Sequence, residues 1–410
     1  MTNLESQFKD LTGLPFITND SKQYIGDKTY SLADIGLNIN QQEFDDISTN
    51  LAQVFDKAQK SISALTEKEL KDYCFNPKVI DLIKQSNDEL CYMRLGYIVD
   101  AKTNELKLIE INSQTPSFNF ELEAGTDTLL SLKNEKSRPV KYLVNLTNCL
   151  VDNLEQCAIK VNKDLKNCTI GFYTCNSSED IFEINYLKKI VDSLQLANKT
   201  LIVTDNLDFN PEGRVIDNTD GLDIPIDILF NWQPLEWKID SVYDDGTSFL
   251  DLFSKAVLGN QVAIFNGIAS FTAQHKYLMN YIQDNELAGN KAKYLATSYY
   301  TQDELIADLG NVDFIGKPIY GRQGAGIFGM VNNSEFSGDL SDEYYNLQPY
   351  IYQPYYHCVP IIEDKTLYNV TVEKFVYKTS QGWQPGGQGL RLDTDKVINN
   401  ISKWHILSYD

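Results

Sequence analysis

The stretch Phe314–Met330 reads FIGKPIYGRQGAGIFGM and places a glycine-rich loop between two apolar segments that favour strands. The loop glycines would let the backbone approach a ligand closely, because glycine has no Cβ and leaves its N–H group bare. They are Gly321, Gly324 and Gly326. Lys317 and Arg322 add positive charge beside them. The pattern predicts a strand, a loop and a strand that cover phosphate groups as a lid, with a glycine-rich hairpin that binds nothing as the alternative.

Composition limits the classes of fold and partner. The chain has 410 residues, enough for two or three subdomains and a substantial core. Its 36 lysines and arginines against 57 aspartates and glutamates give a net charge of −21, which repels nucleic acid and anionic membranes and suits solubility or a cationic small substrate. Seven cysteines without CxxC spacing and an N-terminus without an apolar segment predict a cytoplasmic protein with neither a disulfide framework nor a zinc site.

Two strand candidates upstream, Cys91–Val99 and Glu105–Asn112, are separated by a turn-like segment and predict a hairpin. Side chains alternate along a strand, so every second residue of the second strand should lie on one face. That face would carry Leu106, Leu108, Glu110 and Asn112.

Glu110 is a charged residue in an otherwise apolar run. With Asn112 it could bind one Mg²⁺ ion, because this cation prefers oxygen ligands. A solvated or paired structural carboxylate is the alternative. Arg94, on the partner strand, is either the counter-ion of Glu110 or a ligand for phosphate.

The remaining pattern alternates helices and strands. Apolar spacing predicts a helix over 41–65, and the segments 168–174, 179–194 and 201–204 predict a strand, a helix and a strand in a small parallel sheet. Trp232–Trp237 is interpreted as a packed corner or a pocket wall. Two further predictions are a strand over Tyr294–Tyr299 and, at Gly386–Arg391, a mobile basic finger or a surface turn.

Taken in order, several motifs resemble those of the glutathionylspermidine synthase family of ATP-grasp carboxylate–amine ligases. The resemblance covers the chain from about residue 90 to its end. The matching motifs are Arg94, Lys107–Asn112 with Thr115-Pro116, Trp232–Trp237, His275-Lys276, Lys317–Gly324, Tyr352-Gln353 and Gly387–Arg391.

The resemblance implies an α+β fold with α/β character, a circularly permuted ATP-grasp fold joined to a small parallel-sheet domain. We expect residues 1–140 to hold the N-terminal helices and the metal-ligand hairpin, 141–245 the parallel-sheet substrate domain, and 246–410 the nucleotide-binding lysines and the lid. No accompanying amidase domain fits upstream, so we expect the synthetase part alone.

It also implies a role for each matching residue. ATP would be held by Lys276, Lys317 and Arg322, covered by the lid glycines, and met at its adenine by the stretch around Gln353. Glu110 and Asn112 would bind Mg²⁺. Arg94 and Arg391 would stabilise transition-state charge, with Arg391 reaching the γ-phosphate. The substrate pocket would be lined by Thr115, Ser117, Glu236 and Arg322.

The implied activity is an ATP-dependent ligase that joins a carboxylate, of a peptide or an amino acid, to an amine such as a polyamine through an acyl phosphate. One position departs from the family pattern, because Gly96 stands where the family has a metal-binding aspartate. A protein that binds nucleotide or peptide without catalysis is therefore the alternative. The sequence leaves the oligomeric state open.

Overall fold

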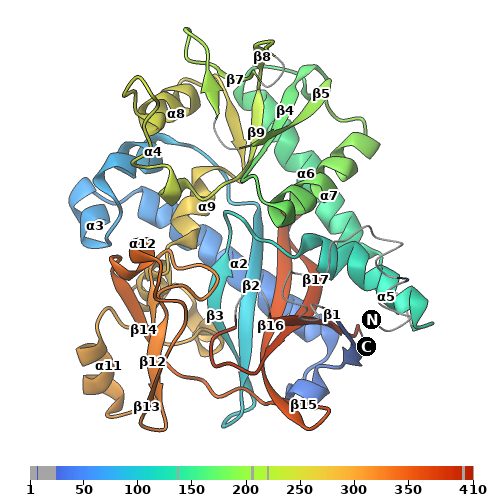
Figure 1. Ribbon diagram of the computed structural model, residues 1–410, viewed down its shortest axis with the longest axis vertical. Helices are drawn as coiled ribbons and strands as arrows, with labels where there is room; N and C mark the ends of the chain where they lie inside the picture. The colour runs from blue at the N-terminus through green and yellow to red at the C-terminus, as the bar shows by residue number, and fades with distance from the viewer. Residues whose placement is uncertain are drawn as a thin grey trace.

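A computed structural model describes residues 25–135, 138–204, 207–218, 221–398 and 402–409, together with Gln7. Within these residues the strands form four sheets (Figure 1). We call the largest the central sheet, that of β4, β5, β9 and β10 the parallel sheet, and that of β11 to β14 the lid sheet. In Figure 1 the parallel sheet lies above the central sheet and the lid sheet lies to its lower left.

The strands have the following bounds. The central sheet runs in the order β1 (Ile25–Tyr30), β18 (Lys403–Leu407), β17 (Gly382–Asp393), β16 (Thr366–Thr379), β2 (Tyr92–Asp100) and β3 (Glu105–Asn112), with β15 (Ile361–Glu363) beside β16. The parallel sheet runs β10 (Ala263–Phe265), β9 (Ile228–Trp232), β4 (Thr169–Thr174) and β5 (Lys199–Thr204). The lid sheet runs β13 (Ser334–Ser337), β12 (Phe328–Val331), β11 (Phe314–Pro318) and β14 (Tyr350–Pro354). A small sheet holds β6 (Asp208–Phe209), β7 (Val215–Asp217) and β8 (Ile224–Pro225).

The helices of the described residues surround these sheets. They are α2 (Gln41–Ser63), α3 (Glu67–Asp72), α4 (Ile80–Gln85), α5 (Thr126–Leu132), α6 (Lys141–Lys160), α7 (Ser178–Ser193), α8 (Phe249–Leu258), α9 (Gly267–Gln274), α10 (Tyr277–Asp284), α11 (Gln302–Leu309) and α12 (Glu343–Asn346). The β4–α7–β5 unit is parallel, as its sequence predicts.

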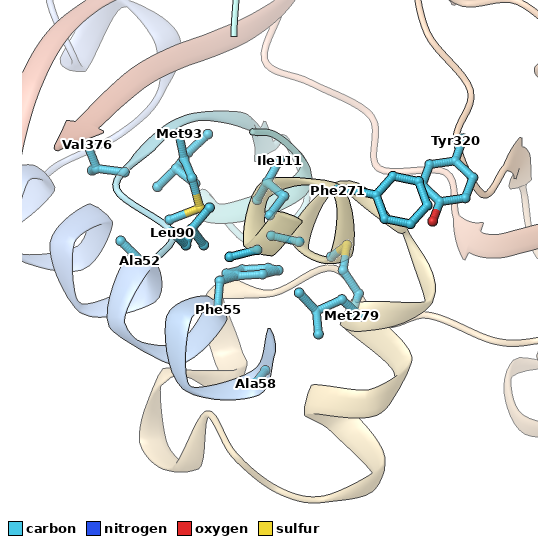
Figure 2. Close-up of a cluster of buried hydrophobic side chains, with 14 of the residues drawn as sticks. Ala52, Phe55, Ala58, Leu90, Met93, Ile111, Phe271, Met279, Tyr320 and Val376 are labelled. Carbon is cyan, nitrogen blue, oxygen red and sulfur yellow. The ribbon is translucent and has the colours of Figure 1, made fainter. Parts of the chain in front are cut away.

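Helix α2 covers one face of the central sheet, and the prediction of a helix there is confirmed. Its Ncap residue Asn40 accepts a hydrogen bond from the Glu43 N–H, which satisfies one of the free donors at the helix start. Buried apolar side chains recur at three- and four-residue spacing along it: Phe44, Ile47, Leu51, Phe55, Ala58 and Ile62. Figure 2 shows Phe55 in the same cluster as Met93 of β2 and Met279 of α10.

The same cluster anchors the glycine-rich lid. Tyr320, immediately before the loop, stacks on Phe271 of α9 with ring centroids 5.0 Å apart (Figure 2). The Tyr320 N–H also donates to Gln348 Oε1. The loop therefore leaves the core from a fixed point, and the predicted strand–loop–strand is confirmed as β11, loop and β12.

The predicted hairpin is confirmed as β2 and β3, but its register corrects one expectation. A bulge at Ile109 breaks the alternation, since Tyr97 pairs with Leu108 while Gly96 pairs with Glu110. Leu106 and Leu108 consequently lie in the core under α2, with Tyr97 and Val99. The prediction that they share a face with Glu110 and Asn112 is wrong, and the bulge is what turns these two polar side chains away from the core.

The expectation of a mobile finger or surface turn at Gly386–Arg391 is also wrong. These residues form the middle of β17, inside the central sheet. A Cβ on Gly387 would lie 2.3 Å from the Leu122 carbonyl oxygen, so the glycine admits close packing of the segment that follows β3. Its role is a close approach of two backbones, not freedom to move.

The strand predicted over Tyr294–Tyr299 is absent from the described residues. The segment follows a 3₁₀ helix, Gly289–Tyr294, and contributes only isolated bridges at Leu295 and Tyr299. The division at residues 140 and 245 stays a prediction, although strands from 1–140 and 246–410 share the central sheet.

Lys374 on β16 gives a test of the core that is separate from any ligand. It is fully buried under α2, where its Nζ lies 2.7 Å from Asp45 Oδ1. We expect Lys374→Ala to lower the free energy of unfolding by about 3 kcal/mol, because the buried Asp45 carboxylate loses its buried cation and keeps Lys141, Tyr142 and Gln41 as partners. Urea unfolding would measure it. Lys141→Ala, at the exposed partner, should cost about 0.5 kcal/mol, and equal losses for the two variants would contradict this description.

Candidate active site

Two adjoining cavities lie where the central, parallel and lid sheets meet. The larger has a volume of about 340 Å³ and the smaller about 100 Å³. Both are lined by Glu110, Lys317, Ile327, Arg391 and Ile398, so one ligand could extend from one cavity into the other. Almost all residues predicted for the site line one cavity or both. The exceptions among them are Gly326, whose φ of +70° shapes the lid, and Glu236, which binds a lining residue.

Two buried lysines face the larger cavity from different elements. Lys276, between α9 and α10, donates to the carbonyl of Gly321 at 2.8 Å, and Lys317 on β11 donates to the carbonyl of Ile109 at 3.2 Å. Burial lowers the pKa of Lys317 to about 8, although Glu110 raises it. Burial also lowers the pKa of Lys276. Burying an ammonium group away from water is unfavourable, and an anionic ligand in the cavity would offset this for both lysines.

Glu110 and Asn112 project from β3 toward the same space. Burial alone would raise the pKa of Glu110, but the cations around it lower that pKa below its ordinary value. These cations are Lys276, Lys317, Arg94 and Arg391. Asn112 Oδ1 is buried and has no hydrogen-bond partner among the described residues. An ionised carboxylate beside an unsatisfied amide oxygen fits a hard cation such as Mg²⁺.

Arg94 and Arg391 converge on one aromatic ring. Their guanidinium carbons lie 4.9 and 4.8 Å from the centroid of Phe118. Phe118 has a φ of +76°, which is rare for a bulky residue, and Glu183 holds this turn by accepting from the Phe118 and Asn119 N–H groups. A strained, well-supported aromatic residue thus fixes both arginines at the cavity wall.

Arg322 fastens the lid to the wall opposite. Its Nε and Nη2 lie 2.8 and 2.7 Å from Glu236 Oε1, and its Nη1 donates to Thr115 Oγ at 3.0 Å. Gln114 donates to the other oxygen of Glu236 at 2.7 Å. The Glu236 carboxylate is therefore engaged by the lid, and a cationic substrate would have to displace Arg322 to use it.

The lining of the larger cavity also includes residues that the sequence reasoning missed, namely Ser177, Glu179 and Asp180, where β4 leads into α7. Trp232 and Trp237, which the sequence offers as a packed corner or a pocket wall, line the same cavity where the neighbouring strand β9 ends. Ligand sites form outside the carboxyl ends of parallel strands, so the predicted parallel sheet was a usable signal. Burial raises the pKa of Glu179 to about 7, with Glu121 and Asp180 adding to the shift.

The smaller cavity joins an apolar wall to the charged residues that it shares with the larger one, and it also has the amide group of Gln353. Its lining includes Ile98, Ile109, Ile315, Val370 and Val397. Gln353 on β14 is 1% exposed and donates to Ser298 Oγ at 3.0 Å, while its Oε1 finds no hydrogen-bond partner in the described part of the chain. A flat heteroaromatic ring with an amino group would fill such a space and satisfy that oxygen.

Comparison with known proteins assigns the family. The family described as glutathionylspermidine synthase preATP-grasp matches residues 3–407. The chain belongs to this family. The match begins far upstream of residue 90, where the motifs alone place the start of the resemblance, and the search of curated proteins found no match. The family resemblance inferred from the motifs is confirmed, and the family is one of ATP-dependent ligases.

The fold is ATP-grasp-like, as the motifs imply. The chain is similar to a solved structure, a glutathione synthetase-like effector from Globodera pallida in its apo form, with a TM-score of 0.57 and 10% identity. The similarity covers 99% of this chain and 96% of the other. At this identity it shows the fold alone.

Other classes of site find no support in the described residues. No cluster of three or more His, Cys, Asp or Glu side chains suited to a metal occurs there. The cysteines of the described residues are not joined in disulfides. No helix in the described residues is both long and apolar enough to cross a membrane.

Proposed function

We propose that this protein is an ATP-dependent ligase that joins the carboxylate of a peptide or amino acid to an amine, with a polyamine as the amine. The observation that carries the proposal is the convergence of Lys276, Lys317 and Arg391 with Glu110 and Asn112 where the two cavities meet. Cations around a metal-binding carboxylate are what phosphoryl transfer requires, because its chief demands are positioning and neutralisation of charge.

In this proposal ATP spans both cavities. The adenine occupies the smaller one, with its amino group donating to Gln353, and the phosphates lie between Lys276 and Lys317 under the lid. Glu110 and Asn112 would hold Mg²⁺, which supplies charge neutralisation at the phosphates. Arg94 and Arg391, both fixed on Phe118, stabilise the charge on the transferred group.

The chemistry proceeds in two steps. A carboxylate oxygen of the acid substrate attacks the γ-phosphorus, ADP leaves, and an acyl phosphate remains. The amine nitrogen then attacks the acyl carbon, inorganic phosphate leaves, and the amine loses a proton as the amide forms. Thr115 and Ser117 line the larger cavity beside Arg322, a suitable place for the acid substrate. The acidic end at Glu179 and Asp180 suits a cationic amine, a role that Glu236 could take only after releasing Arg322.

A non-catalytic nucleotide- or peptide-binding protein is the second candidate. It is favoured by Gly96, which lacks the metal-binding carboxylate expected at this position. The two candidates differ in turnover. The purified protein would be incubated with ATP, Mg²⁺ and paired panels of peptides and polyamines, and ADP and phosphate would be measured. The ligase should release both in equal amounts only when an acid and an amine are present. ATP binding by calorimetry without release for any pair would favour the second candidate.

The pKa of Lys317 predicts how nucleotide affinity depends on pH. Only the protonated lysine pairs with phosphate, and burial lowers its pKa to about 8 in the free protein. Above pH 8 binding must therefore be accompanied by proton uptake, so ATP affinity should fall by up to about tenfold per pH unit. Calorimetry between pH 7 and 9.5 would measure it, with Lys317→Met as a control that lacks this slope. A wild-type affinity that stays constant above pH 8 would contradict the prediction.

A further inference from the structure

Gly96 sits in the middle of a row of facing residues across the central sheet. It pairs with Glu110 of β3 on one side and with Glu373 of β16 on the other. Directly opposed residues in antiparallel strands project to the same face. Glu373 therefore projects on the same face as Glu110, and both side chains line the smaller cavity together with Gly96.

The side chains of Glu110 and Glu373 both lie beside the space that a side chain at position 96 would occupy. A Cβ built on Gly96 would lie 3.2 Å from Glu110 Cγ and 3.7 Å from Glu373 Oε2. An aspartate side chain at position 96 would thus occupy the space where the end of the Glu373 side chain lies. Glu373 begins one strand away, about 4.8 Å, and its longer side chain spans that separation.

Glu373 is held in place but keeps coordinating capacity. It is 3% exposed, and Thr371 donates its hydroxyl to Oε1 at 3.0 Å. Oε2 lies 3.2 Å from Arg94 Nε but has no hydrogen-bond partner among the residues described. A carboxylate offers about four lone-pair positions, and this environment uses few of them. A buried anion of this kind can pair with an arginine and ligate a cation at once.

We infer that Glu373 supplies, from the neighbouring strand, the metal-binding carboxylate that Gly96 lacks. The inference rests on the proposed function, since it places Glu373 with Glu110 and Asn112 around the Mg²⁺ of the ATP complex. The set then has two carboxylates and one amide oxygen, a charge and oxygen count suited to a hard cation. A buried glutamate that serves only as the counter-ion of Arg94 would leave metal affinity unchanged when it is altered.

Mn²⁺ binding tests the inference without any turnover. Free Mn²⁺ would be titrated by electron paramagnetic resonance into the protein saturated with a non-hydrolysable ATP analogue. Glu373→Gln should weaken Mn²⁺ affinity at least about tenfold, as expected for loss of a metal-site partner. Glu373→Ala, which vacates the space beside Gly96, should weaken the affinity at least as much, and adding Gly96→Asp to Glu373→Ala should restore it to within about threefold of wild type. Glu363→Gln removes another buried carboxylate of the central sheet, outside both cavities, and should leave the Mn²⁺ affinity unchanged.

The outcomes separate the inference from the function on which it rests. If the wild type binds neither the analogue nor Mn²⁺, the proposed function fails and the inference with it. Wild-type binding together with unchanged affinity in Glu373→Gln overturns the inference alone. Glu373→Asp keeps the charge near Arg94 and so serves as the variant should Glu373→Gln fail to fold. It should weaken Mn²⁺ binding about threefold or more, and an unchanged affinity there overturns the inference equally.

Discussion

Replacing Lys317 by alanine should weaken ATP binding about 300-fold, or about 3.4 kcal/mol. Lys317 is 4% exposed and faces both cavities. It is the one cation on β11, so a phosphate bound beside this strand would lose its positively charged partner there. Truncating one partner of a buried charge pair costs about 2–5 kcal/mol, because the other charge is left without compensation. Calorimetric titration with ATP at pH 7 would measure the loss.

Two control variants separate this effect from a loss of folding. Lys374→Ala removes a second buried lysine of similar environment, on the opposite face of the central sheet, and should lower stability while ATP affinity stays within about threefold of wild type. Lys68→Ala removes an exposed lysine of α3 and should affect neither. An ATP affinity for Lys317→Ala within threefold of wild type would show that the lid strand does not hold the phosphates.

Replacing Arg391 by alanine should lower kcat about 1000-fold and change the KM for ATP less than fivefold. The proposal places this guanidinium at the transferred phosphoryl group, where charge develops, and contacts made there act mainly in the transition state. It is buried near the end of β17 and lies over the Phe118 ring, so its position is fixed before substrates bind. Steady-state kinetics with the acid and amine pair found in the release assay would give both constants.

Arg391→Lys should recover less than a tenth of the lost rate, because an ammonium group lacks the planar fork that stacks on the ring and reaches two oxygens. Arg214→Ala, which removes a partly exposed arginine paired with Asp227, should keep both constants near wild type. A large rise in KM with little change in kcat would assign Arg391 to ground-state binding and would contradict its proposed role.

Much of the fold could be predicted from local sequence patterns. The capping residue and apolar spacing of α2, the alternating unit β4–α7–β5 and the strands on either side of the lid are each determined by side chains close together in sequence. Part of the candidate site could be predicted for the same reason, since its lysines, its arginines and the Glu110–Asn112 pair lie in short motifs.

What the sequence did not reveal depends on contacts between distant segments. The bulge at Ile109 is set by the pairing of β2 with β3, and a period-two pattern carries no sign of it. The glycines of β17 look like a turn in the sequence, and only the structure shows that they admit the segment around Leu122. Glu373 lies beside Gly96 only through the pairing of β16 with β2, although the two residues are 277 positions apart along the chain (373 − 96). Register of this kind is a property of the folded sheet.

One nucleotide should span the two cavities, and a crystal structure with a non-hydrolysable ATP analogue and Mn²⁺ tests this most directly. We expect the adenine beside Gln353, the phosphates between Lys276 and Lys317 under the lid, and anomalous scattering from Mn²⁺ within ligand distance of Glu110 and Asn112. Nucleotide bound outside these cavities, or ordered nucleotide with no metal at Glu110, would contradict it.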